Sequence, residues 1–362
     1  MNTSRLAIFK IAGSPMEITE TFIPKLNPGE ILIRNLYATL CRSDLNTFDG
    51  KRIEKAPTIL GHENIGTIEE LGPNAWLFDE RGLPMSVGDR VTWSIFASDR
   101  NSTLGRKGIP QKSPDLFKYG HEMITPESTL HGGLAEYIIL RRNTSVIKLS
   151  DEISSKFAAT INCTVATVAG ALRLAGKISG KTIGVIGAGM LGTIACAMCK
   201  ANGAEKVIVF DIDNNRLSNS KKFGANQSIN LRNEYDIIEL LPKMDIILEF
   251  SGSPDSIEKS FDMLTIGGVV ILAGSTFPQR NISINAEKIL RNLHSIKGLH
   301  NYNNHDFINA VDFVETHYNA FPFNELIEAE FPFERINEAF RYAIDNNPYR
   351  VGITFNHSKL YE

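Results

Sequence analysis

The sequence predicts an α/β protein with two domains, one β-rich and one built on a doubly wound parallel sheet. Length is the first reason, because 362 residues exceed what a single hydrophobic core usually supports. Pattern is the second: short strands broken by turn residues come first, and from about Ser154 apolar strands alternate with helices, which is typical of a parallel sheet covered on both faces. We therefore assign residues 1–153 and 299–362 to the β-rich domain and residues 154–298 to the parallel-sheet domain.

Composition narrows the class of protein. The formal charge of −3, from 38 basic and 41 acidic residues without a long basic run, argues against nucleic acid as the main partner. No apolar run approaches the length of a membrane-spanning helix, and the N-terminus lacks the apolar segment of a signal peptide. Four cysteines do not make a disulfide framework in a chain of this length, so we expect a cytoplasmic protein without a membrane partner.

The β-rich domain begins with short strands between Leu6 and Leu45. The clearest is Glu30–Leu36, which follows the turn Pro28-Gly29. Further strands are predicted at Ile65–Leu71, Gly88–Trp93, Gly132–Leu140 and Arg350–Phe355. The last of these returns to the first domain, and the whole pattern indicates a β-rich unit with partial barrel character.

Two cysteines and a histidine are the candidate metal ligands: Cys41, His62 and Cys163. Two thiolates and an imidazole suit zinc, and three protein ligands leave one coordination position open, as in catalytic zinc sites. Glu63 is an occasional or outer ligand in this interpretation, and Asp44 is the carboxylate that fixes the tautomer of the imidazole. The alternative is that the cysteines are ordinary buried thiols and the histidine is a satisfied core residue.

A polar segment, Asp99–Lys118, carries five basic against two acidic side chains, a local charge of +3. It is either a solvated surface loop or a contribution to attracting an anionic substrate. His121 and Glu122 follow it, and either can lie near the metal.

The parallel-sheet domain contains a glycine-rich loop between a strand and a helix. After the predicted helix Phe157–Ala175 comes the apolar strand Thr182–Ile186, then Gly187-Ala188-Gly189-Met190-Leu191-Gly192 and an alanine-rich helix. In this context the glycines permit a tight turn, close approach of backbone amides to a pyrophosphate, and close packing of helix on strand. Further strands are predicted at Val207–Phe210, Asp245–Phe250 and Val269–Ala273.

Asp211 stands at the end of the strand that follows the glycine-rich loop, 19 residues after Gly192 (211 − 192). A carboxylate there accepts hydrogen bonds from both ribose hydroxyls and repels a 2′-phosphate, which predicts NAD over NADP. Arg216 lies close enough to soften this preference unless it is a charge on the helix surface. Cys196 and Cys199 form a Cys-x-x-Cys, but their place inside the helix after the loop favours packing over a metal or redox site.

Taken together, these motifs resemble the zinc-dependent medium-chain alcohol dehydrogenases over nearly the whole chain, and most of all the branch associated with phosphonate catabolism. The segments that carry the resemblance are Asp44–Leu45, Pro57–Glu63, Gly88–Ser94, Phe117–Glu122 and His300–Tyr302. The resemblance implies a GroES-like catalytic domain, a Rossmann dinucleotide-binding domain, one catalytic zinc ion and NAD. It also implies a homodimer or homotetramer acting on a small alcohol or aldehyde, including one that bears a phosphonate.

The resemblance assigns roles to individual residues. Ser43 accepts the hydroxyl proton of the substrate, with Asp44 and Glu63 as the other predicted catalytic residues beside the zinc ion. Thr167 packs against the nicotinamide. The candidates for holding an anionic group are Arg52, Lys118 and His300.

Two departures from the family pattern are expected to matter. The positions where relatives carry the four cysteines of a structural zinc are here Asp99, Ser102, Gly105 and Ser113, so we expect that ion to be absent. Asn46 stands where many relatives place a histidine, and an amide cannot relay a proton by titrating. Two alternatives remain: a polyol, threonine or sugar-alcohol dehydrogenase of the same fold, and a nucleotide-responsive binding protein without turnover.

Overall fold

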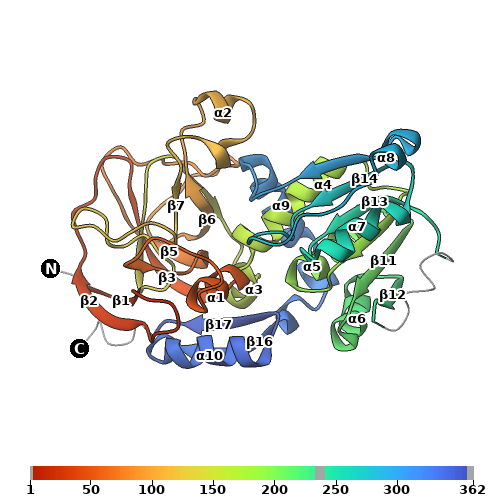
Figure 1. Cartoon of the computed structure of the whole chain (residues 1–362). Helices are drawn as coiled ribbons and strands as arrows, with labels where there is room; N and C mark the ends of the chain where they lie inside the picture. Colours follow the sequence, from red (N-terminus) through yellow and green to blue (C-terminus); the bar gives the residue numbers. More distant parts are fainter. Residues whose placement is uncertain (1–2, 233–240, 357–362) are drawn as a thin grey trace. The chain divides into compact units, whose positions relative to one another are not determined.

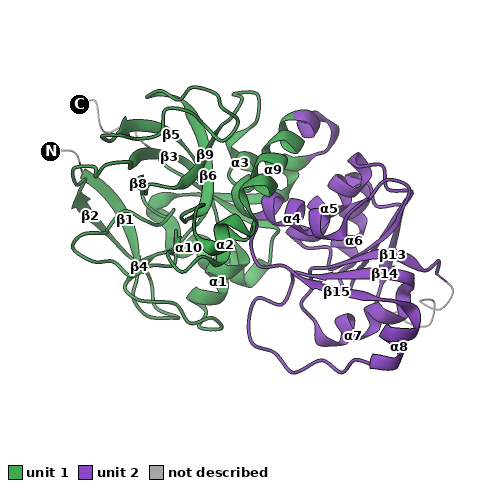
Figure 2. Cartoon of the chain, turned by 90° about the horizontal axis from the view of Figure 1, so that it is seen from above, with its two compact units in different colours: residues 1–163, 303–315, 323–362 green, residues 164–302, 316–322 purple. Residues whose placement is uncertain are grey.

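The computed structural model describes residues 3–232 and 241–356 (Figure 1). These residues form two compact units (Figure 2). Of the described residues, unit 1 contains 3–163, 303–315 and 323–356, and unit 2 contains 164–232, 241–302 and 316–322. The predicted domains changed at 153/154 and 298/299, whereas the units change at 163/164 and 302/303, and a short second segment of unit 2 follows residue 315.

Unit 1 is a β-rich unit with two sheets. The larger sheet runs β16-β17-β3-β5-β6-β7, with β8 paired to β3 and β9 paired to β6, and the smaller sheet runs β2-β1-β4. Its strands are β1 (Thr3–Phe9), β2 (Glu17–Phe22), β3 (Ile31–Thr39), β4 (Thr58–Ile59), β5 (Glu63–Leu71), β6 (Arg90–Ala97), β7 (Phe117–Lys118), β8 (Tyr137–Leu140), β9 (Thr144–Lys148), β16 (Ile327–Pro332) and β17 (Arg350–Thr354). The last strand, β17, therefore pairs with β3 in the sheet of the first unit, as predicted.

The helices of unit 1 are short except near the C-terminus. They are α1 (Arg42–Phe48), α2 (Thr103–Arg106), α3 (Ser155–Ala158), α9 (Asn304–His317) and α10 (Ile336–Asn346). Phe48 on α1 and Phe340 on α10 pack with ring centroids 4.8 Å apart, inside a core that also contains Ile353 of β17. This packing fixes α1, the helix that follows the first candidate ligand.

Unit 2 holds a six-stranded parallel sheet in the order β12-β11-β10-β13-β14-β15. Figure 2 shows α4 and α5 on one face of this sheet and α7 and α8 on the other. The strands are β10 (Thr182–Ile186), β11 (Lys206–Asp211), β12 (Gln227–Asn230), β13 (Met244–Glu249), β14 (Leu264–Leu272) and β15 (Ser295–Gly298). The helices are α4 (Ala166–Ala175), α5 (Met190–Ala201), α6 (Asn214–Ser220), α7 (Pro254–Met263) and α8 (Ala286–Asn292). The predicted α/β class with a doubly wound sheet is confirmed.

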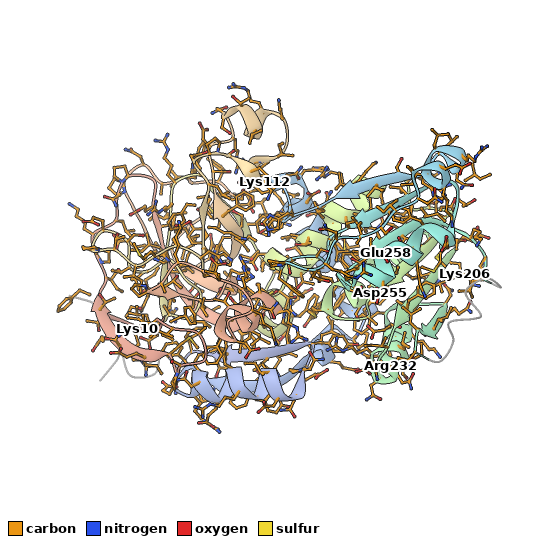
Figure 3. The ribbon with its side chains drawn as sticks, in the orientation of Figure 1. Lys10, Lys112, Lys206, Arg232, Asp255 and Glu258 are labelled. Carbon is orange, nitrogen blue, oxygen red and sulfur yellow. The ribbon has the colours of Figure 1, made fainter. Side chains whose placement is uncertain are left out.

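Ion pairs on the surface of unit 2 tie the segment before α8 to α7. Asp255 and Glu258, both labelled in Figure 3, pair with Arg280, and the Glu258 oxygen lies 2.7 Å from the guanidinium. Exposed pairs of this kind contribute little to stability individually.

One expectation about apolar length was wrong. The helical run Ser155–Ala175 has 21 residues and is apolar enough to pass a length and composition test for a membrane span. Its apolar side chains face protein instead, because 78% of the tested window is buried inside the structure. A helical run that is apolar over most of its surface is expected in the core of a protein.

Candidate metal centre and glycine-rich loop

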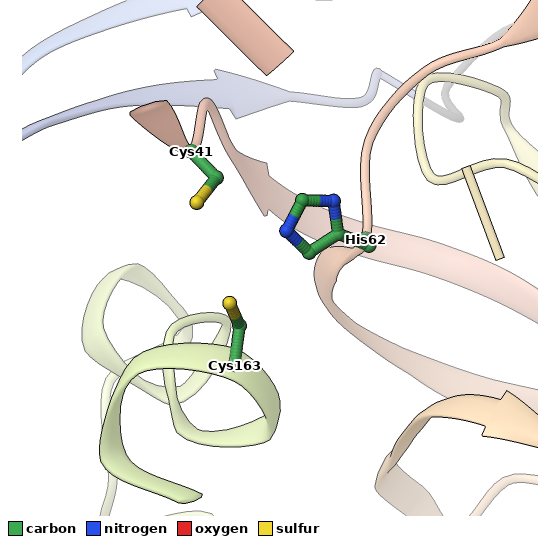
Figure 4. A group of neighbouring side chains, drawn as sticks. All are labelled: Cys41, His62 and Cys163. Carbon is green, nitrogen blue, oxygen red and sulfur yellow. The ribbon is translucent and has the colours of Figure 1, made fainter. Parts of the chain in front are cut away.

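Cys41, His62 and Cys163 converge in unit 1 (Figure 4). One ligand atom from each side chain lies within 4.8 Å of the other two. A tetrahedral zinc ion with ordinary bond lengths separates such donors by about 3.5–3.8 Å, so a small inward shift suffices to hold one ion. The donor set and its spacing therefore fit zinc.

Asp44 organises two of the three ligands. Its Oδ2 accepts the backbone N–H of Cys41 at 3.0 Å, at the start of α1, and its Oδ1 accepts the N–H of Gly61 at 3.2 Å. The same Oδ1 lies 3.4 Å from Nδ1 of His62. Because Nδ1 faces a carboxylate, Nε2 is the nitrogen left for a metal, and Figure 4 shows one ring nitrogen turned toward the two sulfurs.

The third ligand lies on a π-helical turn, Ile161–Val165. Single π turns inside helices are frequent at functional sites. Nδ2 of Asn162 donates to the carbonyls of His62 at 3.0 Å and Trp93 at 2.9 Å, so this turn is fastened to the β-rich sheet. These two hydrogen bonds orient Cys163 toward the other two ligands, and no motif in the sequence predicts this role for Asn162.

Glu63 is fully buried, and its carboxylate is held by other side chains. Oε2 accepts from Oγ1 of Thr39 at 2.6 Å and from Nε of Arg350 at 2.7 Å, and Oε1 accepts from Nη2 of Arg350 at 2.8 Å. The same Nη2 lies 3.6 Å from Sγ of Cys41. Glu63 lies outside the group of converging donor atoms, so its role as a ligand stays a prediction. Arg350, which was not among the predicted site residues, is a further member of this centre.

The three ligands influence one another's protonation strongly. A hydrogen bond from the Cys163 thiol, together with Arg350 and His62, holds the pKa of Cys41 well below its usual range despite burial. The Cys41 thiolate and burial raise the pKa of Cys163 well above its usual range. Burial disfavours protonation of His62, but Asp44 and Cys41 outweigh it and raise the pKa of His62 to about 10. Metal uptake must therefore displace protons from this centre.

Basic side chains lie beside the metal ligands. His121 is buried, with its ring centroid 5.4 Å from that of His62 and its Nδ1 3.0 Å from Oε1 of Glu54, which also pairs with Arg52. Burial and the Arg52 charge lower the pKa of Lys118 to about 8, and Cys163 acts in the opposite direction. Lys118 forms no ion pair with any other residue in the described part of the chain.

The other predicted site residues around the metal have these positions. Ser43 is half-buried in the first turn of α1, two residues after Cys41, and Asn46 is half-buried on the same helix. Glu122 pairs with Lys55 at 2.6 Å, which directs it away from a ligand role. His300 lies in unit 2, after β15, and is not part of the group assembled by unit 1.

The loop expected to lack a structural zinc is held by hydrogen bonds. Oγ of Ser102 and Oγ of Ser113 lie 2.7 Å apart, and the backbone N–H of Asp99 donates to Asp115 at 2.6 Å. A Cβ at Gly105 would lie 2.5 Å from the Arg100 carbonyl oxygen, so the backbone in its present form has no room for a cysteine there.

In unit 2 the glycine-rich loop joins β10 to the N-terminus of α5, and packing explains two of its glycines, Gly187 and Gly192. Gly187 has φ +93°, in the left-handed region that favours glycine, and a Cβ there would meet the Ser251 amide at 2.9 Å. A Cβ at Gly192 would lie 1.8 Å from the Gly187 carbonyl oxygen. Met190 and Leu191 begin α5. The loop therefore presents backbone at a helix N-terminus, which is suited to binding phosphate.

Asp211 closes this loop from the neighbouring strand. Its Oδ2 accepts the N–H of Ala188 at 2.6 Å, and its Oδ1 accepts the N–H groups of Ile212 at 2.6 Å and Asp213 at 2.9 Å. The carboxylate thus positions the loop, and its predicted role in binding the ribose stays a prediction. Arg216 is half-buried, with Nη1 3.5 Å from the position of a Cβ on Gly189, so it lies over the loop and is not a freely solvated helix charge.

The remaining predicted residues of unit 2 lie on helices. Thr167 is half-buried on α4. Cys196 and Cys199 are fully buried inside α5, and burial raises the pKa of both thiols, that of Cys199 to about 12. This is what the packing interpretation predicts.

Two family descriptions match the chain. The alcohol dehydrogenase GroES-like domain matches residues 27–151, and the zinc-binding dehydrogenase domain matches residues 191–316. The chain is 31% identical over 288 residues to an L-threonine 3-dehydrogenase of Pyrococcus horikoshii, covering 76% of this chain and 77% of that protein. It is 30% identical over 294 residues to a sorbitol dehydrogenase of Bacillus subtilis, covering 78% of each.

Solved structures agree on the fold. An alcohol dehydrogenase from Thermotoga maritima superposes with a TM-score of 0.92 at 24% identity, covering 98% of this chain and all of that one (100%). A zinc-binding dehydrogenase from Sinorhizobium meliloti, solved with NADP bound, gives 0.86 at 18% identity over 98% of this chain and 100% of that chain.

Proposed function

The chain belongs to the zinc-dependent medium-chain alcohol dehydrogenase family, and from that premise we propose that it transfers a hydride between NAD(H) and a small alcohol or aldehyde bearing an anionic group such as a phosphonate. The observation that carries the proposal is the convergence of Cys41, His62 and Cys163 within 4.8 Å of one another.

The metal centre of the proposed enzyme holds one zinc ion per chain. When bound, zinc supplies a Lewis acid that lowers the pKa of an alcohol oxygen. Cys41, His62 and Cys163 hold the ion, and Asp44 keeps the imidazole in the tautomer with Nε2 free. Ser43, on the first turn of α1 next to Cys41, accepts the hydroxyl proton of the substrate. Asn46 cannot pass that proton on by titrating, so we propose that water carries it to solvent.

NAD is the proposed hydride carrier. The nicotinamide supplies the hydride chemistry, and the protein supplies binding and orientation. Backbone amides of the glycine-rich loop and the N-terminus of α5 bind the pyrophosphate, and Thr167 packs against the nicotinamide. Asp211 supports NAD because its negative charge repels a 2′-phosphate. Arg216 opposes that preference, so we expect measurable but weaker use of NADP.

An anionic substrate group is supported by two basic side chains. Lys118 lacks an ion-pair partner among the described residues, and the Arg52 charge is close enough to lower its pKa. Arg52 pairs with the Glu54 carboxylate, whereas Lys118 has no such partner in the part of the chain that the structure describes, so an anion beside Lys118 would offset the repulsion between the two positive charges. We propose that Lys118 and Arg52 hold that anion.

A metal assay combined with a screen of alcohols tests the proposal. The purified protein should contain one zinc ion per chain and should change the nicotinamide absorbance with a small alcohol. Cys41→Ala should lose the zinc ion and the turnover. A Cys41→Ala protein with full turnover would show that the assignment is wrong. Dinucleotide binding without turnover of any alcohol would favour the nucleotide-responsive binding protein instead.

The second candidate is a polyol, threonine or sugar-alcohol dehydrogenase, which the names of the relatives favour. Turnover of phosphonate-bearing and neutral alcohols at increasing salt distinguishes the two, because capture of an anion weakens as salt screens the charges. We also propose that the protein is a cytoplasmic homodimer or homotetramer. Light scattering on the purified protein tests the subunit number, and fractionation of the cells that produce it tests the location.

A further inference from the structure

Arg350 is buried between a carboxylate and a candidate zinc ligand. Its side chain is 7% exposed and that of Glu63 is not exposed at all. The guanidinium meets both carboxylate oxygens, through Nε at 2.7 Å and Nη2 at 2.8 Å. Nη2 also lies 3.6 Å from Sγ of Cys41. One nitrogen atom therefore contacts both the carboxylate and the thiolate.

Strand register creates this arrangement. β17 and β5 both pair with the end of β3, where Thr39 lies opposite Gly352 on one side and Glu63 on the other. Continuing the antiparallel register by two residues sets Arg350 opposite Cys41. The side chains of Arg350 and Glu63 therefore meet beside Cys41, just after the end of β3.

The charges at this position explain why an arginine is needed. The thiolates of Cys41 and Cys163 and the carboxylates of Glu63 and Asp44 give four negative charges, and zinc supplies only two positive ones. Arg350 adds a third positive charge without occupying a coordination position. An unpaired buried carboxylate beside the ion would instead gain stabilisation by binding the metal directly, since hard oxygen donors also bind zinc.

We propose that Arg350 is a positioning residue that holds the Glu63 carboxylate off the metal and so keeps the fourth coordination position open for substrate. This inference rests on the proposed zinc-dependent function. The forked guanidinium matches both oxygens at once, and Thr39 holds Oε2 at 2.6 Å, so the carboxylate cannot turn toward the ion without breaking several charge-assisted hydrogen bonds.

Cobalt substitution tests the inference by a readout other than activity. Co²⁺ in the zinc site has visible absorption bands that report coordination number, and imidazole, added as a probe, changes them on entering an open position. We expect Arg350→Met to alter these bands and to weaken imidazole binding by roughly 10-fold or more, as for other changes next to metal ligands. Adding Glu63→Gln to the same chain should restore imidazole binding, because a neutral amide no longer competes for the metal.

Arg335→Met is the matched control. Arg335 forms an ion pair with Glu338 at 2.5 Å, and both side chains are exposed. Because Arg335 is also far in sequence from every candidate ligand, losing this ion pair should leave the cobalt bands and the imidazole affinity unchanged. A buried ion pair that is merely structural would lower stability in Arg350→Met without changing the cobalt spectrum. Unchanged bands and affinity in Arg350→Met, or no recovery in the double variant, would overturn the inference.

A second substitution, Arg350→Lys, provides the test if Arg350→Met does not fold. In Arg350→Lys a single ammonium cannot fork across both carboxylate oxygens and reach Sγ of Cys41. We expect a smaller change in the same direction, and wild-type bands and affinity would overturn the inference. If wild-type protein showed no thiolate-to-cobalt bands at all, the zinc assignment and hence the proposed function would fail. Thiolate bands that are indifferent to Arg350 would refute only the positioning role.

Discussion

Replacing Asp44 by asparagine removes a negative charge from the point that organises the ligands. Three donors face its two oxygens: the Cys41 amide at 3.0 Å, the Gly61 amide at 3.2 Å, and Nδ1 of His62 at 3.4 Å. An asparagine has one oxygen and one NH₂ group. Whichever way the amide turns, its NH₂ group faces a backbone N–H, so at least one buried donor loses its acceptor.

The two orientations of that amide have different consequences. With NH₂ facing Cys41, the start of α1 loses its hydrogen bond. With NH₂ facing His62, the imidazole accepts at Nδ1 and carries its proton on Nε2, where the metal should bind. We expect the metal-free protein to lose about 1–3 kcal/mol of stability, as for one unsatisfied buried donor. We expect zinc affinity to fall about 10–100-fold, as for other partners of zinc-bound histidines.

Competition with a chromophoric chelator measures the zinc affinity, and urea unfolding of the metal-free protein measures the stability. Asp49→Asn is the matched control, because Asp49 lies just beyond the same helix and forms an exposed pair with Lys51 at 2.6 Å. Its change should be within about 0.5 kcal/mol, as for other surface pairs. If Asp44→Asn bound zinc as tightly as Asp49→Asn does, the assignment of Asp44 as the orienting carboxylate would be refuted.

Three further predictions follow from single contacts. Gly192→Ala should lose dinucleotide binding and about 1–3 kcal/mol of stability, because its Cβ would lie 1.8 Å from the Gly187 carbonyl oxygen. In the control Gly298→Ala the new Cβ has no atom within 4 Å, so both properties should stay unchanged. Fluorescence titration measures the binding, and urea unfolding measures the stability. Burial opposes ionisation of Asp245, but Lys181 and the backbone N–H of Thr182 outweigh it and lower the pKa of this carboxyl group. The stability that the ionised carboxylate contributes at neutral pH should therefore be lost as the pH falls through the lowered pKa. The urea midpoints of Asp245→Asn and of the wild type should then converge in acid. Lys118→Met should reduce kcat/KM for anionic but not for neutral alcohols, with Lys107→Met as the exposed control from the same segment; equal losses for both substrates would contradict an anion-holding role.

The sequence predicted those parts of the site that short motifs carry. Cys41 and His62 stand in segments whose residue types indicate ligands, and the glycine-rich loop is recognisable from its position between a strand and a helix. Asp211 was predicted from its place at a strand end, although its hydrogen bond to the loop itself was not. In each case the residues that indicate the site are neighbours in the sequence.

Arg350 could not be predicted in the same way. It lies 287 positions from the carboxylate that it holds, and only the pairing of β17 with β3 reveals that they meet. The apolar run Ser155–Ala175 was misjudged for a related reason, since the burial of most of its side chains depends on tertiary packing and not on the length of the run. Pairing partners across a sheet are set by the register, which a single sequence does not display.

The position of Arg350 in the chain has a consequence for how the protein is made. Ribosomes build chains from the N-terminus, so all three candidate ligands are synthesised before Arg350, which comes 187 residues after Cys163 (350 − 163). A nascent chain that captures zinc early does so while Glu63 still lacks its guanidinium. The Glu63 carboxylate gains its guanidinium partner only when the last strand, β17, has been made and has joined the sheet.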